Sequence, residues 1–211
     1  MDRNVTALFC TLALLIVDCD GDPIDADKLV ERDGMTYEIN SEVGFTGRAI
    51  GTHKNGQKAV EATFKDGKPV GKWVEWHKNG QEKLQVNYNQ NGMVDGKRIA
   101  WYENGQKSYE STFKAGGLDG SVTRWYEDGQ KMFETNYNNG KQEGVSIWWY
   151  EAMSSSDKSP QKKREEVWKD GKQDGKWTRW YLNGRKSSEA IWSDGKRIKQ
   201  MKWDENGQEI N

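Results

Sequence analysis

Two histidines are the side chains in this sequence with the clearest capacity for metal or acid–base chemistry. His53 and His77 each stand six residues after a glycine, at equivalent places in neighbouring segments. A zinc site needs three or four nitrogen, sulfur or carboxylate ligands at suitable spacing. No cysteine or acidic residue accompanies the pair at such a spacing. We therefore interpret the histidines as aromatic residues of a repeated position and predict no metal site.

The sequence also lacks the usual signs of a catalytic centre. It contains no G-x-S-x-G sequence, and its two cysteines, Cys10 and Cys19, lie in or beside an N-terminal apolar segment. Its glycines do not form a phosphate-binding loop between a strand and a helix. Glutamates recur at one position of several segments, whereas a catalytic residue is usually singular. We predict that the protein is not an enzyme and binds no cofactor.

The recurring side chains predict an extended contact surface instead. Tyrosine combines a large ring with a hydroxyl and has few rotamers to freeze, which suits it to binding surfaces. The alternative is that these rings cover the second side of a thin sheet. The predicted binding face consists of Tyr102, Tyr126, Tyr150, Tyr181, Glu110, Glu134 and Glu189.

These residues are placed by a repeat of about 24 residues, the kind of fixed period that marks repeat architectures. A glycine opens each of six units, a second glycine follows Asn or Asp nine residues later in five of them, and a third closes the unit. A tryptophan stands five residues after the opening glycine in units two to six. The opening glycines are Gly47, Gly71, Gly96, Gly120, Gly144 and Gly175.

Each unit is predicted to be one β-hairpin with a three-residue turn and a left-handed glycine. Such a turn would place Val74 and Trp76 on the same face as Leu84, Val86 and Tyr88. The tryptophans of neighbouring units would then pack against one another on that face. The predicted fold is all-β: an elongated antiparallel single-layer sheet of about six stacked β-hairpin repeats.

The fifth unit carries seven extra residues at its turn. The loop insertion near 151–161 is serine-rich and contains Pro160, which indicates a surface loop. It is either a tolerated insertion or a segment that contacts a partner. Trp203 and Asn206-Gly207 resemble a truncated seventh unit that would cap the sheet.

Composition excludes some classes of function. The 211 residues include 32 Lys and Arg and 33 Asp and Glu, so the net charge is -1 and no basic stretch predicts nucleic-acid binding. The 11 Trp, 8 Tyr and 5 Phe argue against disorder despite the low hydrophobicity.

The N-terminus differs from the repeats. An apolar run from Val5 to Val17 is too short to cross a bilayer but has the length of an export signal. Cys19 follows it where a bacterial lipoprotein carries its lipidated cysteine, although Asp18 departs from the small residue usual before that cysteine. The alternative is a buried N-terminal element. We expect residues 1–19 to be an export or lipoprotein signal, 20–46 a linker and capping segment, and 47–211 the repeat array.

The repeat resembles a known family. The pattern G-x-W-x-x-W-Y-x-N-G-Q-K, closely matched by residues 175–184, is similar to the MORN repeat variant of bacterial chains. The segments 29–37 and 44–47 resemble the start of YwqK-type chains, which are grouped as antitoxins of toxin–antitoxin systems. The resemblance covers residues 28–211 and implies a MORN-like fold, with functions in scaffolding and attachment.

Three classes of function remain. The first is a protein-binding scaffold, exported to the periplasm or outer surface or lipid-anchored through Cys19, and cytoplasmic if the signal is not used. The second is an antitoxin or immunity protein that neutralises a partner toxin. The third is a glycan- or envelope-binding module that stacks sugars on the Tyr and His rings. In the first two classes the partner is another protein, and in none is it nucleic acid.

Overall fold

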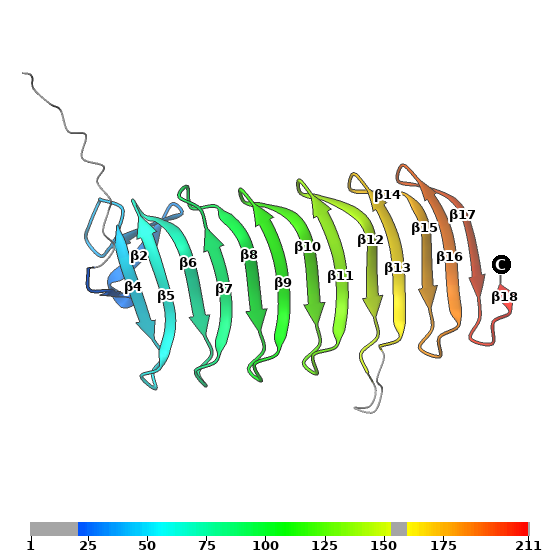
Figure 1. Cartoon of the computed structure of the whole chain (residues 1–211), viewed down its shortest axis with the longest axis horizontal. Helices are drawn as coiled ribbons and strands as arrows, with labels where there is room; N and C mark the ends of the chain where they lie inside the picture. The colour runs from blue at the N-terminus through cyan, green and yellow to red at the C-terminus, as the bar shows by residue number, and fades with distance from the viewer. Residues whose placement is uncertain (1–20, 153–159, 211) are drawn as a thin grey trace, which may run out of the picture.

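The computed structural model describes residues 21–152 and 160–210, and it shows one long sheet of consecutive hairpins (Figure 1). The predicted signal at 1–19 and the centre of the predicted insertion lie outside the described residues. Strands pair in chain order from β4 to β18, with each neighbour antiparallel, whereas β1 joins β4 in parallel and β14 is a short partner of β13. The all-β prediction is confirmed. The strands are β1 (Ile24–Asp25), β2 (Leu29–Arg32), β3 (Met35–Glu38), β4 (Gly47–Thr52), β5 (Lys58–Lys65), β6 (Lys68–Trp76), β7 (Glu82–Tyr88), β8 (Val94–Trp101), β9 (Lys107–Lys114), β10 (Gly117–Trp125), β11 (Lys131–Asn138), β12 (Lys141–Trp149), β13 (Lys162–Lys169), β14 (Lys172–Gln173), β15 (Gly175–Trp180), β16 (Lys186–Ser193), β17 (Lys196–Trp203) and β18 (Glu209–Ile210), with a 3-10 turn η1 at Ala26–Lys28.

Six hairpins make up the repeat array, and β17–β18 form the short seventh that the sequence predicts. Hairpins 1 to 6 are β4–β5, β6–β7, β8–β9, β10–β11, β12–β13 and β15–β16.

The turns have the predicted chemistry. In hairpin 2 the His77 amide donates to the Gln81 carbonyl at 2.8 Å, and the Gly80 amide donates back to the His77 carbonyl at 3.0 Å. Gly80 has φ +85°, a left-handed conformation that favours glycine. The three-residue loop with a left-handed glycine is therefore confirmed.

A β-bulge beyond each turn reverses the side-chain alternation that the sequence predicts. In hairpin 2, Trp73 pairs with Val86, but Trp76 pairs with Glu82, which leaves Lys83 as an extra residue in the second strand. The same shift occurs at the equivalent point of all six hairpins. A bulge adds one residue to one strand, so it exchanges the faces of everything beyond it.

The predicted arrangement of faces is consequently wrong. Val86 shares its face with Trp73, whereas Val74 and Trp76 lie on the opposite face. The row of tryptophans at the Trp76 position also does not form a ring stack among the described residues. Instead, lysine ammonium groups of the preceding hairpins lie over these rings, at 4.9 Å for Lys58 on Trp76 and 5.9 Å for Lys107 on Trp125.

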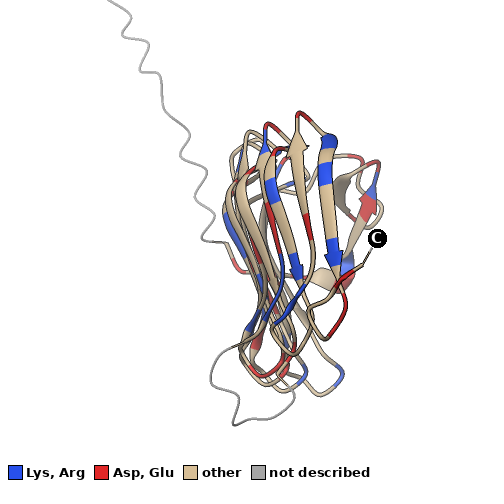
Figure 2. Ribbon diagram, turned by 90° about the vertical axis from the view of Figure 1, so that its right-hand side faces the viewer, with Lys and Arg blue, Asp and Glu red and all other residues tan. Residues whose placement is uncertain are grey.

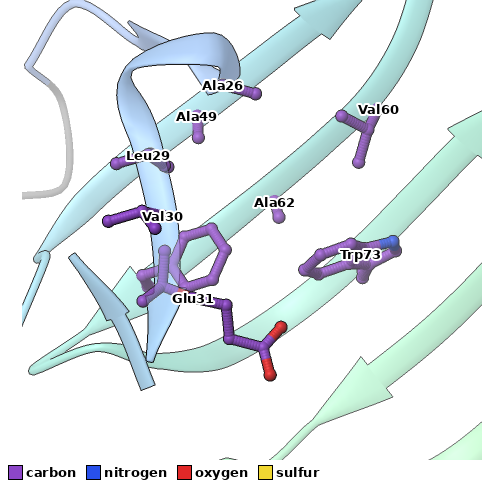
Figure 3. A pocket seen from close by; sticks show the side chains of 10 residues that line it. Ala26, Leu29, Val30, Glu31, Ala49, Val60, Ala62 and Trp73 are labelled. Atoms are coloured by element: carbon purple, nitrogen blue, oxygen red, sulfur yellow. The ribbon is translucent and has the colours of Figure 1, made fainter. Parts of the chain in front are cut away.

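One face of the sheet, which we call the inner face, is covered at its N-terminal end. Phe45, Ala49, Ala62 and Phe64 are buried there, and Leu29 packs against them. Backbone hydrogen bonds from Thr36 to the Gly67 carbonyl and from the Gly67 amide to the Phe45 carbonyl, both 2.8 Å, fix the capping segment in place. Figure 3 shows Leu29 and Val30 of β2 over Ala49, Ala62 and Trp73, where a small pocket of about 170 Å³ remains.

The other face, the outer face, carries charged and β-branched residues together with the row of tryptophans at the Trp76 position. Seen end-on in Figure 2, ribbon segments coloured for basic and for acidic residues occur together on the strands and turns. The described part of the chain holds no helix with the length and apolarity that crossing a bilayer requires.

Candidate binding face

The tyrosines and histidines that the sequence singled out connect successive hairpins. The Tyr126 hydroxyl donates to the carbonyl of Trp149 in the next hairpin at 2.9 Å, and His77 Nε2 lies 2.9 Å from the carbonyl of Trp101. Tyrosine and histidine both occur at this position because each can present a ring-borne donor to that carbonyl. The row comprises His53, His77, Tyr102, Tyr126, Tyr150 and Tyr181, each bonded to the tryptophan carbonyl one hairpin ahead.

Burial changes the acidity of two of these phenols. Desolvation is the main cause that raises the pKa of Tyr102, and the nearby carboxylates Glu127 and Glu151 raise it further. Desolvation likewise raises the pKa of Tyr126, again with help from Glu151. These hydroxyls therefore stay protonated, so they remain hydrogen-bond donors to the backbone at physiological pH.

The asparagines of the turns make a second set of links, which sequence reasoning missed. The Asn79 side-chain oxygen accepts from the Gln81 amide at 3.0 Å, and its amino group donates to the Glu103 carbonyl of the next turn at 2.7 Å. Asn55, Asn104 and Asn183 make the same contact with the following turn. The available signal was the recurrence of Asn at this turn position. Asn has a side-chain amino group that can donate a hydrogen bond, whereas Asp does not.

The glutamates of the predicted binding face lie on the outer face and are paired. Glu110 accepts from Lys107 at 2.6 Å and from Lys97 at 2.8 Å, and these two bonds hold the pKa of its carboxyl below the usual range. Glu189 is held in the same way by Lys176 and Lys186, and its pKa is lowered for the same reason.

The predicted Tyr and Glu residues therefore occupy different parts of the molecule. Glu110 pairs across the strands with Ile99 and Thr123 on the outer face, whereas Tyr102 lies at the turn end and borders a pocket of the inner face. The bulge between the turn and the strand separates the two sets. The structure does not bring the seven residues together as one surface.

The inner face of hairpins 3–6 has a different character from the covered end. No described segment packs over it, and the capping segment lies only at the N-terminal end of the array (Figure 1). At its centre Ser111 and Thr135 are buried, and Thr135 Oγ1 lies 2.5 Å from Ser146 Oγ. Gln142 donates to both of those hydroxyls, at 3.0 and 2.8 Å.

Aromatic rings and arginines surround this polar centre. The Tyr109 ring has the guanidinium groups of Arg98 and Arg124 each 5.5 Å from its centroid, and Arg164 lies 3.7 Å over the Trp148 ring. Guanidinium groups stack favourably on aromatic rings. Towards the C-terminal end of the array, three tryptophan rings follow one another at 5.2 and 5.1 Å: Trp168, Trp177 and Trp192.

A buried acid lies beside these tryptophans. Glu166 is 2% exposed and its carboxylate is 3.0 Å from Arg164 Nε. Desolvation raises the pKa of Glu166, against the opposing attraction of Arg164 and Arg179. A small pocket of about 100 Å³ lies here, bordered by Arg197 and Trp192.

Neither His53 nor His77 lies in a cluster of possible metal ligands. Their ring nitrogens face backbone carbonyls, and no group of three His, Cys, Asp or Glu side chains suited to a metal occurs within residues 21–152 and 160–210.

Comparison with known proteins identifies the repeat. Residues 94–115 and 118–139, which include the strands of hairpins 3 and 4, match the family model described as MORN repeat variant. The match covers hairpins 3 and 4, which are therefore similar to the MORN repeat variant. Hairpins 1, 2 and 6 share the left-handed turn glycine with these two hairpins, and all four of the others share the Tyr or His link.

Other comparisons add little to this. No curated protein matches the sequence. The solved structures that it resembles include one titled accessory secretory protein 1, 2 and 3 in Streptococcus pneumoniae, at 17% identity and a TM-score of 0.28. That match covers 51% of this chain and 18% of the other chain. A likeness this distant carries no functional information.

Sequence reasoning missed the inner-face arginines of the repeat array. The available signal was the choice of cation: the cations that pair with the repeated glutamates of the outer face are lysines in all but one case, whereas Arg98, Arg124, Arg164 and Arg179 lie on the inner face.

Proposed function

We propose that this protein is a non-enzymatic binding module that holds another protein on the inner face of hairpins 3–6. The observation that carries the proposal is the contrast along that face. Its N-terminal end is apolar and covered by the chain itself, and the remainder presents aromatic rings and arginines with no described segment over them. Aromatic residues and arginine are the types enriched at protein interfaces.

The array suits this role because it offers a rigid platform. Every hairpin is bonded to the next through its backbone ladder, through a Tyr or His and, in four cases, through a turn asparagine. A rigid surface loses little conformational entropy when it binds, so more of the contact energy remains as affinity. Repeat proteins commonly bind along such extended faces.

Site-specific photocrosslinking in intact cells tests the assignment of the face. A crosslinking phenylalanine analogue would replace Phe133 or Ala190 on the inner face, or the exposed Val145 on the outer face as the matched control. We expect a discrete crosslinked partner from the two inner positions and none from Val145. Crosslinks to one partner from Val145 alone would show that the outer face is the binding surface.

The proposal also places the protein outside the cytoplasm. It rests on the apolar run and Cys19 in the first 19 residues. Cell fractionation with mass spectrometry of the mature N-terminus tests it, and Cys19→Ser separates lipid anchoring from simple export. An unprocessed chain in the cytosol would reject export, and unchanged membrane association of the Cys19→Ser variant would reject lipidation.

A glycan ligand is the second candidate, favoured by the cluster of Trp168, Trp177 and Trp192 on the inner face. Flat indole surfaces with charged neighbours could stack against sugar rings. Co-sedimentation with purified cell wall tests this candidate, with Trp177→Ala as the variant expected to lose binding. Equal sedimentation of that variant and the wild type would contradict it.

A further inference from the structure

We propose that the pocket between hairpins 3 and 4 binds a carboxylate of an acidic peptide segment, held between Arg98 and Arg124. The inference deepens the proposed function, because it assigns the chemistry of the partner on the same inner face, and it rests on that function.

The pocket is formed by the strand register. Tyr109 pairs with Ala100 on one side and with Arg124 on the other, and Arg98 pairs with the neighbouring Ser111. Directly opposite residues in adjacent strands share a face, so both arginines and the ring project from the inner face together. The small side chain at Ala100 leaves space beside Tyr109, and the resulting pocket of about 360 Å³ is also bordered by Tyr102 and Trp125.

Both arginines are exposed and lack a carboxylate partner within the described residues. Their guanidinium groups contact Tyr109, each 5.5 Å from its centroid, and no ion pair of either occurs in that part of the chain. Glu75, the inner-face carboxylate of the preceding hairpin, is already paired with Lys83 at 3.0 Å. On the outer face, by contrast, the repeated glutamates are paired with lysines.

The position of both guanidinium groups near one ring favours anion binding in two ways. The guanidinium planes lose rotational freedom before a ligand arrives, so less entropy is lost on binding. The phenol ring shields part of each guanidinium from water, which strengthens its attraction to an incoming carboxylate. Arginine also offers a fork of N–H donors that matches a carboxylate in bidentate geometry.

The distribution of charge favours a peptide over a nucleic acid or another phosphate polymer. A phosphate polymer requires a continuing series of cations along its path. Here the series is interrupted: the position equivalent to Arg124 is Glu75 in hairpin 2 and Trp148 in hairpin 5, and arginine returns there only at Arg179 in hairpin 6, beside the Arg164 that pairs with Glu166. Two cations beside one pocket fit one acidic side chain, or a terminal carboxylate, of a protein partner.

The test measures binding of a fluorescent hexaglutamate peptide to the full chain by anisotropy at low salt. We expect the double variant Arg98→Gln, Arg124→Gln to bind at least about tenfold more weakly, the loss of roughly one charge-assisted contact. The matched control is Arg48→Gln, Lys176→Gln, which removes the same charge from the outer face and should change affinity less than about twofold.

Each outcome decides the inference. Equal losses in the two double variants, or no binding of hexaglutamate by the wild type, would overturn it. Competition by inorganic phosphate but not by glutamate peptides would overturn the acidic-peptide assignment in favour of a phosphoryl ligand. Ala100→Trp, which fills the pocket and keeps both charges, should also abolish binding, and normal binding by that variant would contradict the site.

The result is separable from that of the proposed function. If inner-face crosslinking captures a partner whose binding does not depend on Arg98 and Arg124, only the acidic-peptide assignment fails. If hexaglutamate binds at this pocket but crosslinking finds the partner on the outer face, the proposed function fails instead.

Discussion

The two ends of the inner face differ at equivalent positions of the same repeat. The centre of the second strand is Ala62 in hairpin 1 and Val86 in hairpin 2, becomes Ser111, Thr135 and Glu166 in hairpins 3, 4 and 5, and is Ala190 in hairpin 6. Hairpins 1 to 4 of this series have the same turn with a left-handed glycine. What changes is the cover, because the capping segment packs over the first two hairpins and reaches no further.

The difference shows that one part of a single-layer sheet can contribute to stability while another part remains free to bind a partner. An apolar centre is favourable only where another layer removes it from water. Beyond the cover, Thr135, Ser146 and Gln142 bond to one another beside the buried Val122, and the surrounding rings remain available to a partner. A contiguous uncovered apolar face would invite aggregation.

The largest expected effect compares two phenylalanines at the same repeat position. Phe64 is 5% exposed and contacts the rings of Phe45 and Trp73, so Phe64→Ala should lower the free energy of unfolding by about 3–5 kcal/mol. Phe113 is half-buried on the uncovered part, and Phe113→Ala should cost roughly half as much. Urea unfolding followed by tryptophan fluorescence measures both. Equal losses would show that the cover does not distinguish the two ends.

A smaller effect is expected at the Tyr and His links, which test whether the covered and uncovered hairpins differ only on the inner face. Tyr126→Phe removes the donor to the Trp149 carbonyl in the uncovered part, and should cost about 1 kcal/mol. His77→Tyr, where the capping segment ends, should change stability by less than about 0.5 kcal/mol because tyrosine can reach the same type of carbonyl. The same urea assay applies. A large loss for His77→Tyr would mean that the links also differ between the two ends.

The smallest expected effect concerns pH. Burial raises the pKa of Glu166 in the folded chain above its unfolded value of about 4.3, so the folded state binds that proton more tightly. The stability that this group contributes is present below the unfolded pKa and is lost as pH rises through the folded pKa. Glu166→Gln should therefore gain stability relative to the wild type as pH rises from about 4 to 8.

Unfolding curves of both proteins across that range isolate the effect, since the paired carboxylates Glu110 and Glu189 titrate equally in each and cancel. If the stability of Glu166→Gln relative to the wild type falls as pH rises, the attraction of Arg164 and Arg179 outweighs desolvation at Glu166.

The sequence alone determined the repeat unit, the hairpin and the turn. A glycine after Asn or Asp at a fixed place needs a left-handed conformation, and Gly80 with its equivalents adopts one. Local rules sufficed there because the interactions join residues only a few positions apart. The Tyr and Glu positions were found in the same way, through their period.

Only the tertiary structure decided which residues share a face. Each hairpin has one bulged residue, such as Lys83, which places Trp76 and Val86 on opposite faces. A sequence pattern of alternating residues does not reveal such a bulge, because the bulge occurs at the same place in every unit. The use of the Tyr126 hydroxyl by a backbone carbonyl 23 residues ahead was equally hidden, because it depends on how hairpins stack. So was the meeting of Arg98 and Arg124 at Tyr109, since those three residues come from three strands that only sheet pairing brings side by side.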